Sequence, residues 1–582
     1  MNTGVKLFGG ILFLLAWAIP ASGGVLVNEI MYHPNSTNVL EEWIELHNNG
    51  PTNVNLSGWQ FTRGVAFTFP TNTVLAAGGY LVVAADGPTF ASKHPGVANV
   101  IAGWSGTLGH SLQLSDKTGQ VINSVEFYGE GDWAVRVLGA AAVPGALDRY
   151  GGLGWVWFAP HDGAGASLEL INPNLPNTDP QNWGPNKDTD STPGRANSIA
   201  ANNVAPFITA VGHSPVIPQP TDPVTITTRV VDEQTTGLTV TLQWRVDGAG
   251  SFTTVTMSDD GAHGDGLAGD GIYGAIVPAQ PNNTIVEFYL QARDAGNNLR
   301  TYPNWITAPG STRTANLLYQ VDSGTYSGDQ PIYRIIMTAA ERAYLEALGN
   351  NPNPGAGATT DSDANMNATW ITTDGVLSGG TTTQLRYNVG VRNRGHGTRR
   401  SRPHNFHINI PSDRLWKNQA GINLNSQYAY SQVLGSAIFR RLAVPMADSR
   451  AVQVRVNGAN EMSLPLPDIN SFGAYAANEQ YNNDFVKRSW PLDPQGDSYR
   501  GIRDPAADIS GVADLSWHGA NYAVSTYTNV YYKQNNFLEN DWSDLIGLIG
   551  VLNVTNGTTA ATYVNDVQRV INVEEWMKYM AS

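Results

Sequence analysis

The sequence predicts a multidomain, mainly β protein in which two β-sandwiches are followed by a mixed α+β region. Its 582 residues are too many for one domain. The first half consists of short runs of alternating apolar residues, separated by Gly, Asn and Pro turns, as in sandwich folds. From about residue 328 onward, stretches with helical periodicity join the strands.

Composition limits the classes of function. Hydrophobic residues make up 41% of the chain and charged residues 14%, with a formal net charge of -15. Such a surface repels phosphate backbones and anionic membranes, so nucleic acid is not an expected partner, whereas an extracellular protein or glycan is. The chain has no cysteine, which excludes disulfides, thiol catalysis and Cys-ligated zinc, and fits a bacterial secreted protein.

Residues 1–23 have the features of a secretory signal peptide. Lys6 provides the positive charge, residues 7–19 are an apolar run, and small residues follow Pro20. A membrane anchor needs about 20 apolar residues, and this run is shorter. We therefore expect a secreted or cell-surface protein with no membrane span in the mature chain.

The first sandwich is expected over residues 25–198. Residues 25–30 and 43–46 alternate as strands do, with Ile44 and Leu46 on one face and Trp43 and Glu45 on the other. Carboxylates on such strands usually pair with surface groups, although Glu29, His33, Glu42 and Glu45 leave a metal site as the alternative. The motifs at 26–32, 42–48, 56–59, 75–80, 182–183 and 192–198 resemble the lamin-tail domain family. That resemblance implies an immunoglobulin-like sandwich with a binding or scaffolding role.

A second sandwich is expected over residues 203–322, after a Pro-rich linker. Residues 224–230, 238–244 and 286–292 have the β-branched content and the period of strands. This stretch is similar to fibronectin type III or immunoglobulin-like modules.

A Gly-rich loop over residues 258–271 contains four aspartates: Asp259, Asp260, Asp265 and Asp270. Calcium takes six to eight oxygen ligands, and glycine lets the backbone present carbonyls. Asp-Gly is also a common hairpin turn, and the spacing is not that of an EF-hand. The loop is therefore either a Ca²⁺ site of the second sandwich or a plain turn.

The third region, residues 328–582, is predicted to be α+β. Thr338 and Glu341 form a capping-box pattern before a helix that reaches residue 348. Further helices are expected at 431–442, 541–552 and 560–571, and a last one is capped by Asn572.

Several motifs of this region resemble the CotH family of spore-coat protein kinases: 387–397, 403–410, 454–458 and 478–488. The resemblance implies ATP and Mg²⁺ as cofactors, with a glycine-containing loop and a lysine that bind phosphates and a glutamate that holds the lysine. The lysine position falls near residues 404–407, where no lysine occurs. The chain ends before the family's Asn/Asp metal segment, so we expect the kinase-like domain to be incomplete and inactive as given, with ATP and Mg²⁺ relevant only to a completed domain.

Arginines gather in this otherwise acidic chain, and phosphoryl groups need such cations. The candidate nucleotide-binding residues are Arg392, Arg394, Arg399 and Arg400, with Arg402 nearby and Glu479 as the glutamate that the resemblance implies. The alternative for the arginines is a solvated or carboxylate-paired face, and for Glu479 an ordinary carboxylate on a helix surface.

The sequence thus predicts an exported modular protein with binding or scaffold sandwiches and an incomplete CotH-like domain. The alternative is a non-enzymatic surface adhesion or scaffold protein. The chain has no Gly-x-Ser-x-Gly elbow, His-Glu-x-x-His helix or Walker loop, and we assign no catalytic residue.

Overall fold

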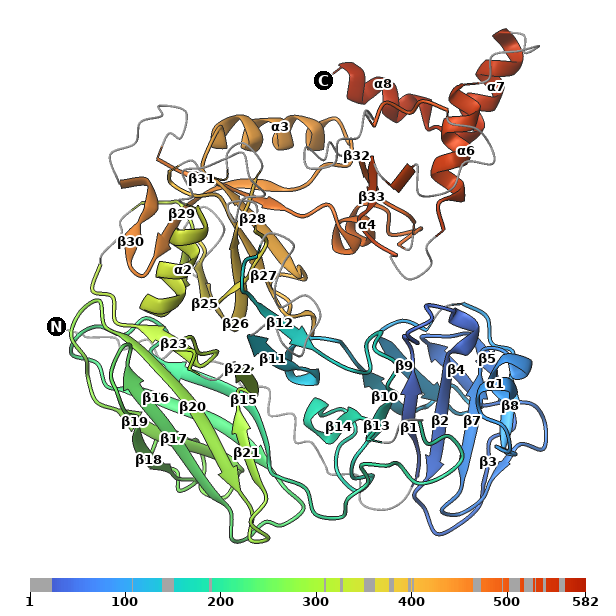
Figure 1. The fold of residues 1–582 in the computed structure, drawn as a ribbon, viewed down its shortest axis with the longest axis horizontal. Coiled ribbons are helices and arrows are strands. Elements are labelled where there is room, and N and C mark those ends of the chain that lie inside the picture. The colour runs from blue at the N-terminus through green and yellow to red at the C-terminus, as the bar shows by residue number, and fades with distance from the viewer. Residues whose placement is uncertain are drawn as a thin grey trace, which may run out of the picture. The chain divides into compact units, whose positions relative to one another are not determined.

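The computed structural model describes residues 24–581 except 107, 139–150, 188–190, 308–309, 325–327, 350–361, 376–381, 396–398, 400–401, 464–472, 495, 502–512, 518–526, 529, 537–540 and 554–559. The predicted signal peptide, residues 1–23, lies outside the described residues. The chain divides into two compact units (Figure 1). In described residues, unit 1 contains 24–32, 40–126 and 167–203, and unit 2 contains 33–39, 127–166 and 204–581.

Unit 1 is built from two main antiparallel sheets and one short helix, as the alternating sequence predicts. The larger sheet runs in the order β14 (Trp183–Pro185), β13 (Leu168–Leu170), β1 (Val25–Met31), β2 (Trp43–Asn48), β7 (Tyr80–Ala84) and β8 (Val100–Ala102), where β8 pairs parallel to β7. The smaller sheet is β10 (Val121–Glu126), β9 (Ser111–Ser115), β4 (Gln60–Arg63) and β5 (Phe67–Thr68), and β3 (Val54–Asn55) pairs with β6 (Val74–Leu75).

The helix of unit 1, α1 (Gly87–Lys93), begins where the sequence caps it. The Asp86 carboxylate accepts the amide of Thr89 at 2.8 Å, and Pro88 occupies the first turn. Phe90 from this helix packs on the buried Trp43. A cap of this kind contributes about 1 kcal/mol, so α1 is stabilised by both its end and its apolar face.

The second sandwich belongs to unit 2 and has two sheets around one apolar core. One sheet is β15 (Phe207–Ser214), β16 (Val224–Val231) and β19 (Ile272–Val277). The other is β18 (Thr253–Met257), β17 (Thr239–Val246), β20 (Ile285–Arg293) and β21 (Leu299–Tyr302), with β23 (Leu317–Gln320) also paired to β20. Ile226, Leu242 and Phe288 are fully buried between them, as the period-two pattern requires.

The third region contains a sheet that closes on itself. Its order is β24 (Ile332–Ile336), β25 (Met366–Thr373), β26 (Thr383–Asn393), β27 (Phe406–Asn409), β28 (Gly421–Asn425), β31 (Tyr475–Glu479), β29 (Ser449–Val456) and β30 (Ala459–Asn460). Closure follows because β24 pairs antiparallel with β25 and parallel with β29. Tyr333, Trp370 and Trp416 meet edge to face in the buried core of this sheet.

Helices join this sheet, so the region contains both α and β elements. They are α2 (Ala339–Gly349), α3 (Ala429–Arg441), α4 (Asn483–Ser489), α6 (Ser543–Leu552), α7 (Ala560–Val570) and α8 (Val573–Ala581), and β32 (Tyr499–Gly501) pairs with β33 (Tyr531–Lys533). Thr338 caps α2 and Asn572 caps α8, as predicted. A kinase-like arrangement of these elements stays a prediction. In the described part of the chain, the helices are too short or too polar to cross a bilayer.

Residues 127–166 lie within the predicted first sandwich in sequence but pack in unit 2. We call this segment the arm. Its strands β11 (Val135–Leu138) and β12 (Trp155–Phe158) form a sheet with β22 (Trp305–Thr307), to which β11 pairs in parallel. Gly154 of the arm comes so close to the third region that a Cβ there would lie 2.6 Å from the backbone nitrogen of Asn365. Nothing in the strand-like pattern of the sequence indicates that the arm packs in unit 2 instead of in the first sandwich.

Candidate functional site

Two of the predicted phosphate-binding arginines share one carboxylate. Arg392, near the end of β26, and Arg399 approach Oδ1 of Asp363 at 2.7 Å and 2.9 Å. Arg399 also donates to the carbonyl oxygen of Ser362 at 2.6 Å. Arg400 lies outside the described residues. For these two side chains the carboxylate-paired alternative therefore describes the geometry, although one carboxylate cannot neutralise two guanidinium groups.

Arg394 differs from its two neighbours. Its guanidinium is half-buried and donates to the amide oxygen of Asn425, and none of the ion pairs found among the described residues includes it. Burial, followed by the charges of Arg392, Arg500 and Arg399, lowers the pKa of Arg394 to about 10. The same cluster acts on His407, whose pKa falls to about 3 through burial and the charge of Arg392. Among the described residues, the ion pairs of Arg392, Arg394 and Arg399 include a single carboxylate, that of Asp363.

Glu479 is not part of the arginine cluster in this structure. It is the last residue of β31 and is only 4% exposed, so the expectation of a carboxylate on a helix surface is wrong. Its carboxylate accepts Nε of Arg488 at 2.9 Å and the amide of Asp448 at 3.0 Å. The resemblance placed the family's lysine near residues 404–407, and there His407 lies 3.0 Å from the amide oxygen of Asn423.

The four aspartates of the Gly-rich loop bind the loop's own backbone. Asp259 accepts the amides of 269, 270 and 271, and Asp265 accepts those of 260, 261 and 263. Asp270 accepts the amides of residues 267 and 272, and Asp260 lies 2.9 Å from Nδ1 of His263. The oxygens stabilise turns, which fits the turn alternative, and a Ca²⁺ site at these residues stays a prediction.

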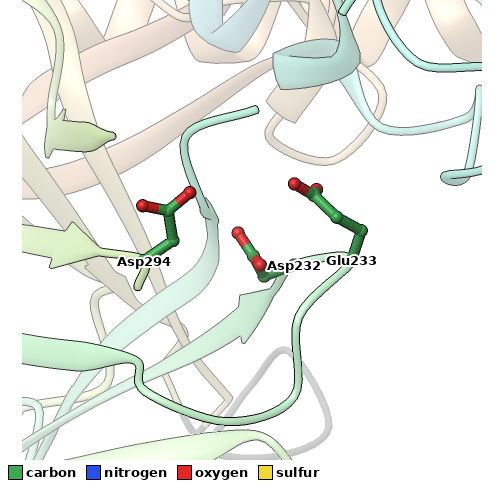
Figure 2. A group of neighbouring side chains, drawn as sticks. All are labelled: Asp232, Glu233 and Asp294. Carbon is green, nitrogen blue, oxygen red and sulfur yellow. The ribbon is translucent and has the colours of Figure 1, made fainter. Parts of the chain in front are cut away.

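Another carboxylate group lies in the same sandwich (Figure 2). Asp232, Glu233 and Asp294 each offer an oxygen within 4.8 Å of the others, and the described residues hold no other His or acidic group that meets this spacing. Oδ2 of Asp232 and Oε2 of Glu233 are buried and accept no hydrogen bond. Burial and then the charges of Glu233 and Asp294 raise the pKa of Asp232. Asp232 and Glu233 are neighbours in sequence but Asp294 is distant from them, which is why no motif indicated the group.

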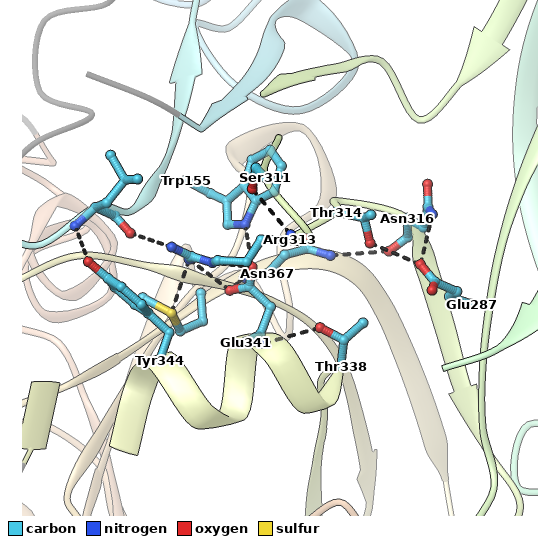
Figure 3. Close-up of polar contacts among 12 residues, drawn as sticks. Trp155, Glu287, Ser311, Arg313, Thr314, Asn316, Thr338, Glu341, Tyr344 and Asn367 are labelled. Atoms are coloured by element: carbon cyan, nitrogen blue, oxygen red, sulfur yellow. Dashed lines mark hydrogen bonds and ion pairs between the residues drawn. The ribbon is translucent and has the colours of Figure 1, made fainter. Parts of the chain in front are cut away.

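A buried ion pair between Arg313 and Glu341 is hydrogen-bonded to the arm (Figure 3). Glu341 on α2 is fully buried and accepts Nε and Nη2 of Arg313 at 2.7 Å and 2.9 Å. It also accepts the indole N–H of Trp155 from the arm at 2.8 Å. The capping-box interpretation therefore holds for Thr338, whose hydroxyl accepts the Glu341 amide, but the Glu341 carboxylate serves this network instead.

A cavity of about 420 Å³ lies where the arm, the second sandwich and the closed sheet meet within unit 2. Its charged lining residues are Asp132, Arg386, Asp413 and Arg414. Arg414 approaches Asp132 at 3.2 Å and donates to the Tyr302 hydroxyl at 2.7 Å, while Arg386 donates to the carbonyl oxygens of Arg414 and Leu415. Arg414 pairs with Asp132, and Arg386 binds backbone carbonyl oxygens. These contacts hold the three elements together, and we assign no ligand to the cavity.

Three glutamates of unit 1 form a row across neighbouring strands. Glu29 on β1 is opposite Glu45 on β2 and opposite Glu169 on β13, and all three are fully buried. The expectation that Glu29 and Glu45 pair with surface groups is therefore wrong. The glutamate row, as we call it, instead contacts residues 192–199 of the same unit.

Comparison with known families assigns three parts of the chain. The Lamin Tail Domain profile matches residues 18–129, the second Ig-like domain of conditioned medium factor matches 225–299, and the CotH kinase protein profile matches 391–582. No curated protein matches the chain. These matches confirm the resemblances to the lamin-tail, immunoglobulin-like and CotH families.

Solved structures give only weak likenesses. A Listeria monocytogenes protein in complex with glucose, magnesium and calcium has 11% identity and a TM-score of 0.14, over 48% of this chain and 31% of that one. The cycloalternan-forming enzyme of the same organism has 10% identity and a TM-score of 0.14, over 51% and 32%. The chain thus spans about a third of their lengths, and such scores support no functional argument. On its sequence families and strand-rich fold, the chain is a modular protein with a lamin-tail domain, an Ig-like domain and a CotH-like domain.

Proposed function

We propose that this chain is an exported modular protein whose CotH-like region binds a phosphorylated ligand without transferring the phosphoryl group. In this proposal the lamin-tail and Ig-like domains serve as binding or scaffold modules. Export rests on the signal-like residues 1–23, and the partner would be an extracellular protein or glycan. Arg394, with Arg392 and Arg399, would contact the phosphoryl oxygens.

The observation that carries the proposal is the excess of positive charge at Arg394. Asp363 is shared by Arg392 and Arg399, and Arg394 has only an amide partner among the described residues. A guanidinium cannot lose its proton at ordinary pH, so an anion is what relieves this repulsion. Planar guanidinium groups bind phosphoryl oxygens in pairs, and half-burial strengthens each contact.

The absence of transfer is supported by the groups beside the arginines. No lysine lies at residues 404–407, and burial and Arg392 keep His407 uncharged, with a pKa of about 3. Glu479, the candidate for holding a lysine, binds Arg488. The lysine that the CotH resemblance implies for binding phosphates therefore has no counterpart at residues 404–407.

Calorimetric titration of the full chain with pyrophosphate tests this binding. We expect Arg394→Gln to weaken binding at least about tenfold, which is the loss of one charge-assisted contact. Arg293→Gln is the matched control, because Arg293 is a partly exposed arginine of the second sandwich that contacts Asn297. Equal affinity of Arg394→Gln and the unmodified chain would contradict the proposal. Phosphoryl transfer from Mg-ATP to any protein would contradict the proposal that the region does not transfer the phosphoryl group.

Calcium binding by the second sandwich is a further proposal, taken over from the composition of the Gly-rich loop. The carboxylate group at Asp232, Glu233 and Asp294 supports it better than the loop aspartates, because two of its buried oxygens have no hydrogen bond. ATP and Mg²⁺ are proposed only as what the CotH resemblance implies.

A further inference from the structure

The glutamate row places three carboxylates side by side in the interior of unit 1. Glu29, Glu45 and Glu169 each have no exposed surface. Burial of an ionised carboxylate without a cation is costly, and three adjacent charges multiply that cost. Each carboxylate therefore needs hydrogen bonds, a proton or both.

Residues 192–199, which we call the latch, provide most of the hydrogen bonds. Glu29 accepts the amide of Thr192 at 3.0 Å, Glu45 accepts the amide of Gly194, and Glu169 accepts the amide of Ile199 at 3.1 Å. The hydroxyl of Ser198 adds a bond to Glu169 at 2.8 Å. The latch is thus held on the sheet by the carboxylates rather than by apolar packing alone.

One hydroxyl group lies between two carboxylates of the row. Thr192 Oγ1 lies 3.0 Å from Oε2 of Glu29 and 2.7 Å from Oε1 of Glu169. The hydroxyl has a single hydrogen, so it can donate to only one of them. If both carboxylates were ionised, the other contact would bring two oxygens together with no hydrogen between them. A proton on Glu29 satisfies both contacts, because Glu29 then donates to Thr192 and the hydroxyl hydrogen of Thr192 goes to Glu169.

We propose that residues 192–199 are a proton-dependent latch, which closes on the first sandwich while the glutamate row holds a proton and opens when the row is fully ionised. The latch is followed within a few residues by Val204, where unit 2 resumes. This inference does not depend on phosphoryl binding.

The ionisable surroundings agree with this direction. Burial and then the opposing effects of its partners set the pKa of Glu29 at about 7, and burial together with the charge of Glu29 raises that of Glu45 to about 8. Among the described residues, the titratable groups near the row and latch include His47 on β2, Tyr80 on β7 and the exposed Lys187 and Arg195. Burial lowers the pKa of His47, and burial and Glu45 raise that of Tyr80, so both side chains stay uncharged as the pH rises above neutral.

Cleavage after Arg195 by trypsin measures opening, because this side chain is exposed but its backbone is fixed by the latch. In the full chain, corrected for cleavage of a short peptide with the same bond, we expect the rate to rise about tenfold from about pH 6 to about pH 9. Glu169→Gln should remove most of this rise, because its amide donates to Thr192 in place of the missing proton. Glu126→Gln, an exposed glutamate of the same unit, is the control and should keep the rise.

A rate that does not change with pH would overturn the latch, as would an undiminished rise in Glu169→Gln. If that variant does not fold, the infrared band of a buried protonated carboxyl in the unmodified chain at neutral pH serves as a second test. Its presence below about pH 7 and loss by about pH 9 support the latch, and its absence throughout overturns it.

Discussion

The glutamate row of unit 1 and the arginine cluster of unit 2 both gather charges of one sign, but each is stabilised in a different way. The glutamates have no exposed surface, and amide and hydroxyl donors contact every one of them. The guanidinium of Arg394 is only half-buried and has one amide partner among the described residues. One cluster is closed to solvent, and the other remains accessible.

This difference determines what relieves the repulsion in each place. A carboxyl can take up a proton, so a buried row responds through its pKa. A guanidinium stays charged, so the arginine cluster responds by binding an anion. The same chain therefore has one charge cluster suited to sensing pH and one suited to binding ligand.

Removing a buried charge that has an oppositely charged partner should cause the largest loss of stability. It gives the reference against which the other two charge clusters are compared. We expect Glu341→Gln to destabilise unit 2 by about 3–5 kcal/mol, because Arg313 would be left buried without its carboxylate. Urea unfolding followed by tryptophan fluorescence measures this loss. Arg440→Gln, which removes an exposed pair with Asp448 in the same unit, should cost less than about 1 kcal/mol. Similar losses in the two variants would show that burial does not control the cost of these charges.

Neutralising a buried carboxylate that lacks a cation should stabilise the protein, whereas Glu341→Gln destabilises it. Burial and the charge of Glu29 raise the folded-state pKa of Glu45 from its ordinary value of 4.5 to about 8, so the stability that the bound proton gives is fully present below about pH 4.5 and is lost as the pH rises through about 8. We expect Glu45→Gln to be more stable than the unmodified chain by about 1–3 kcal/mol at pH 9, and to lose that advantage at pH 5. Hydrogen exchange of the β2 amides measures the difference, and a constant difference across this range would contradict the raised pKa.

Removing the shared carboxylate should increase anion binding by the arginine cluster. Asp363→Asn leaves Arg392 and Arg399 without their ion-pair partner. We expect pyrophosphate to bind about three- to tenfold more tightly, which is at most about 1.4 kcal/mol. The titration described for Arg394→Gln measures it, with the partly exposed Asp222→Asn as the control. Weaker binding in Asp363→Asn would show that this carboxylate positions the arginines for the ligand.

The sequence predicted the strand content and the three families because those depend on local pattern. Alternation placed Ile44 and Leu46 inside, and the polar Thr338 and Asn572 marked helix starts that the structure confirms. These signals are local, since a cap or a strand face is decided within a few residues.

The arm and the glutamate row could not be predicted because their partners are distant in sequence. Trp155 lies 186 positions before the glutamate that its indole contacts, and Thr192 lies 163 positions after Glu29. The strand pattern of Glu29 and Glu45 is the same whether the polar face meets water or a covering segment. Only the position of the latch shows that this face is buried.

Calcium is expected to cause the smallest change in stability. It tests whether the carboxylates of Asp232, Glu233 and Asp294 bind an ion of opposite charge, as we propose for the arginine cluster. If Asp232, Glu233 and Asp294 bind Ca²⁺, millimolar calcium should raise the melting temperature of the chain by about 1–3 °C. Asp294→Asn should abolish the rise and Asp259→Asn should preserve it, because the Asp259 oxygens already accept backbone amides. The reverse pattern would place the ion in the Gly-rich loop. No rise in any protein would contradict calcium binding at both groups.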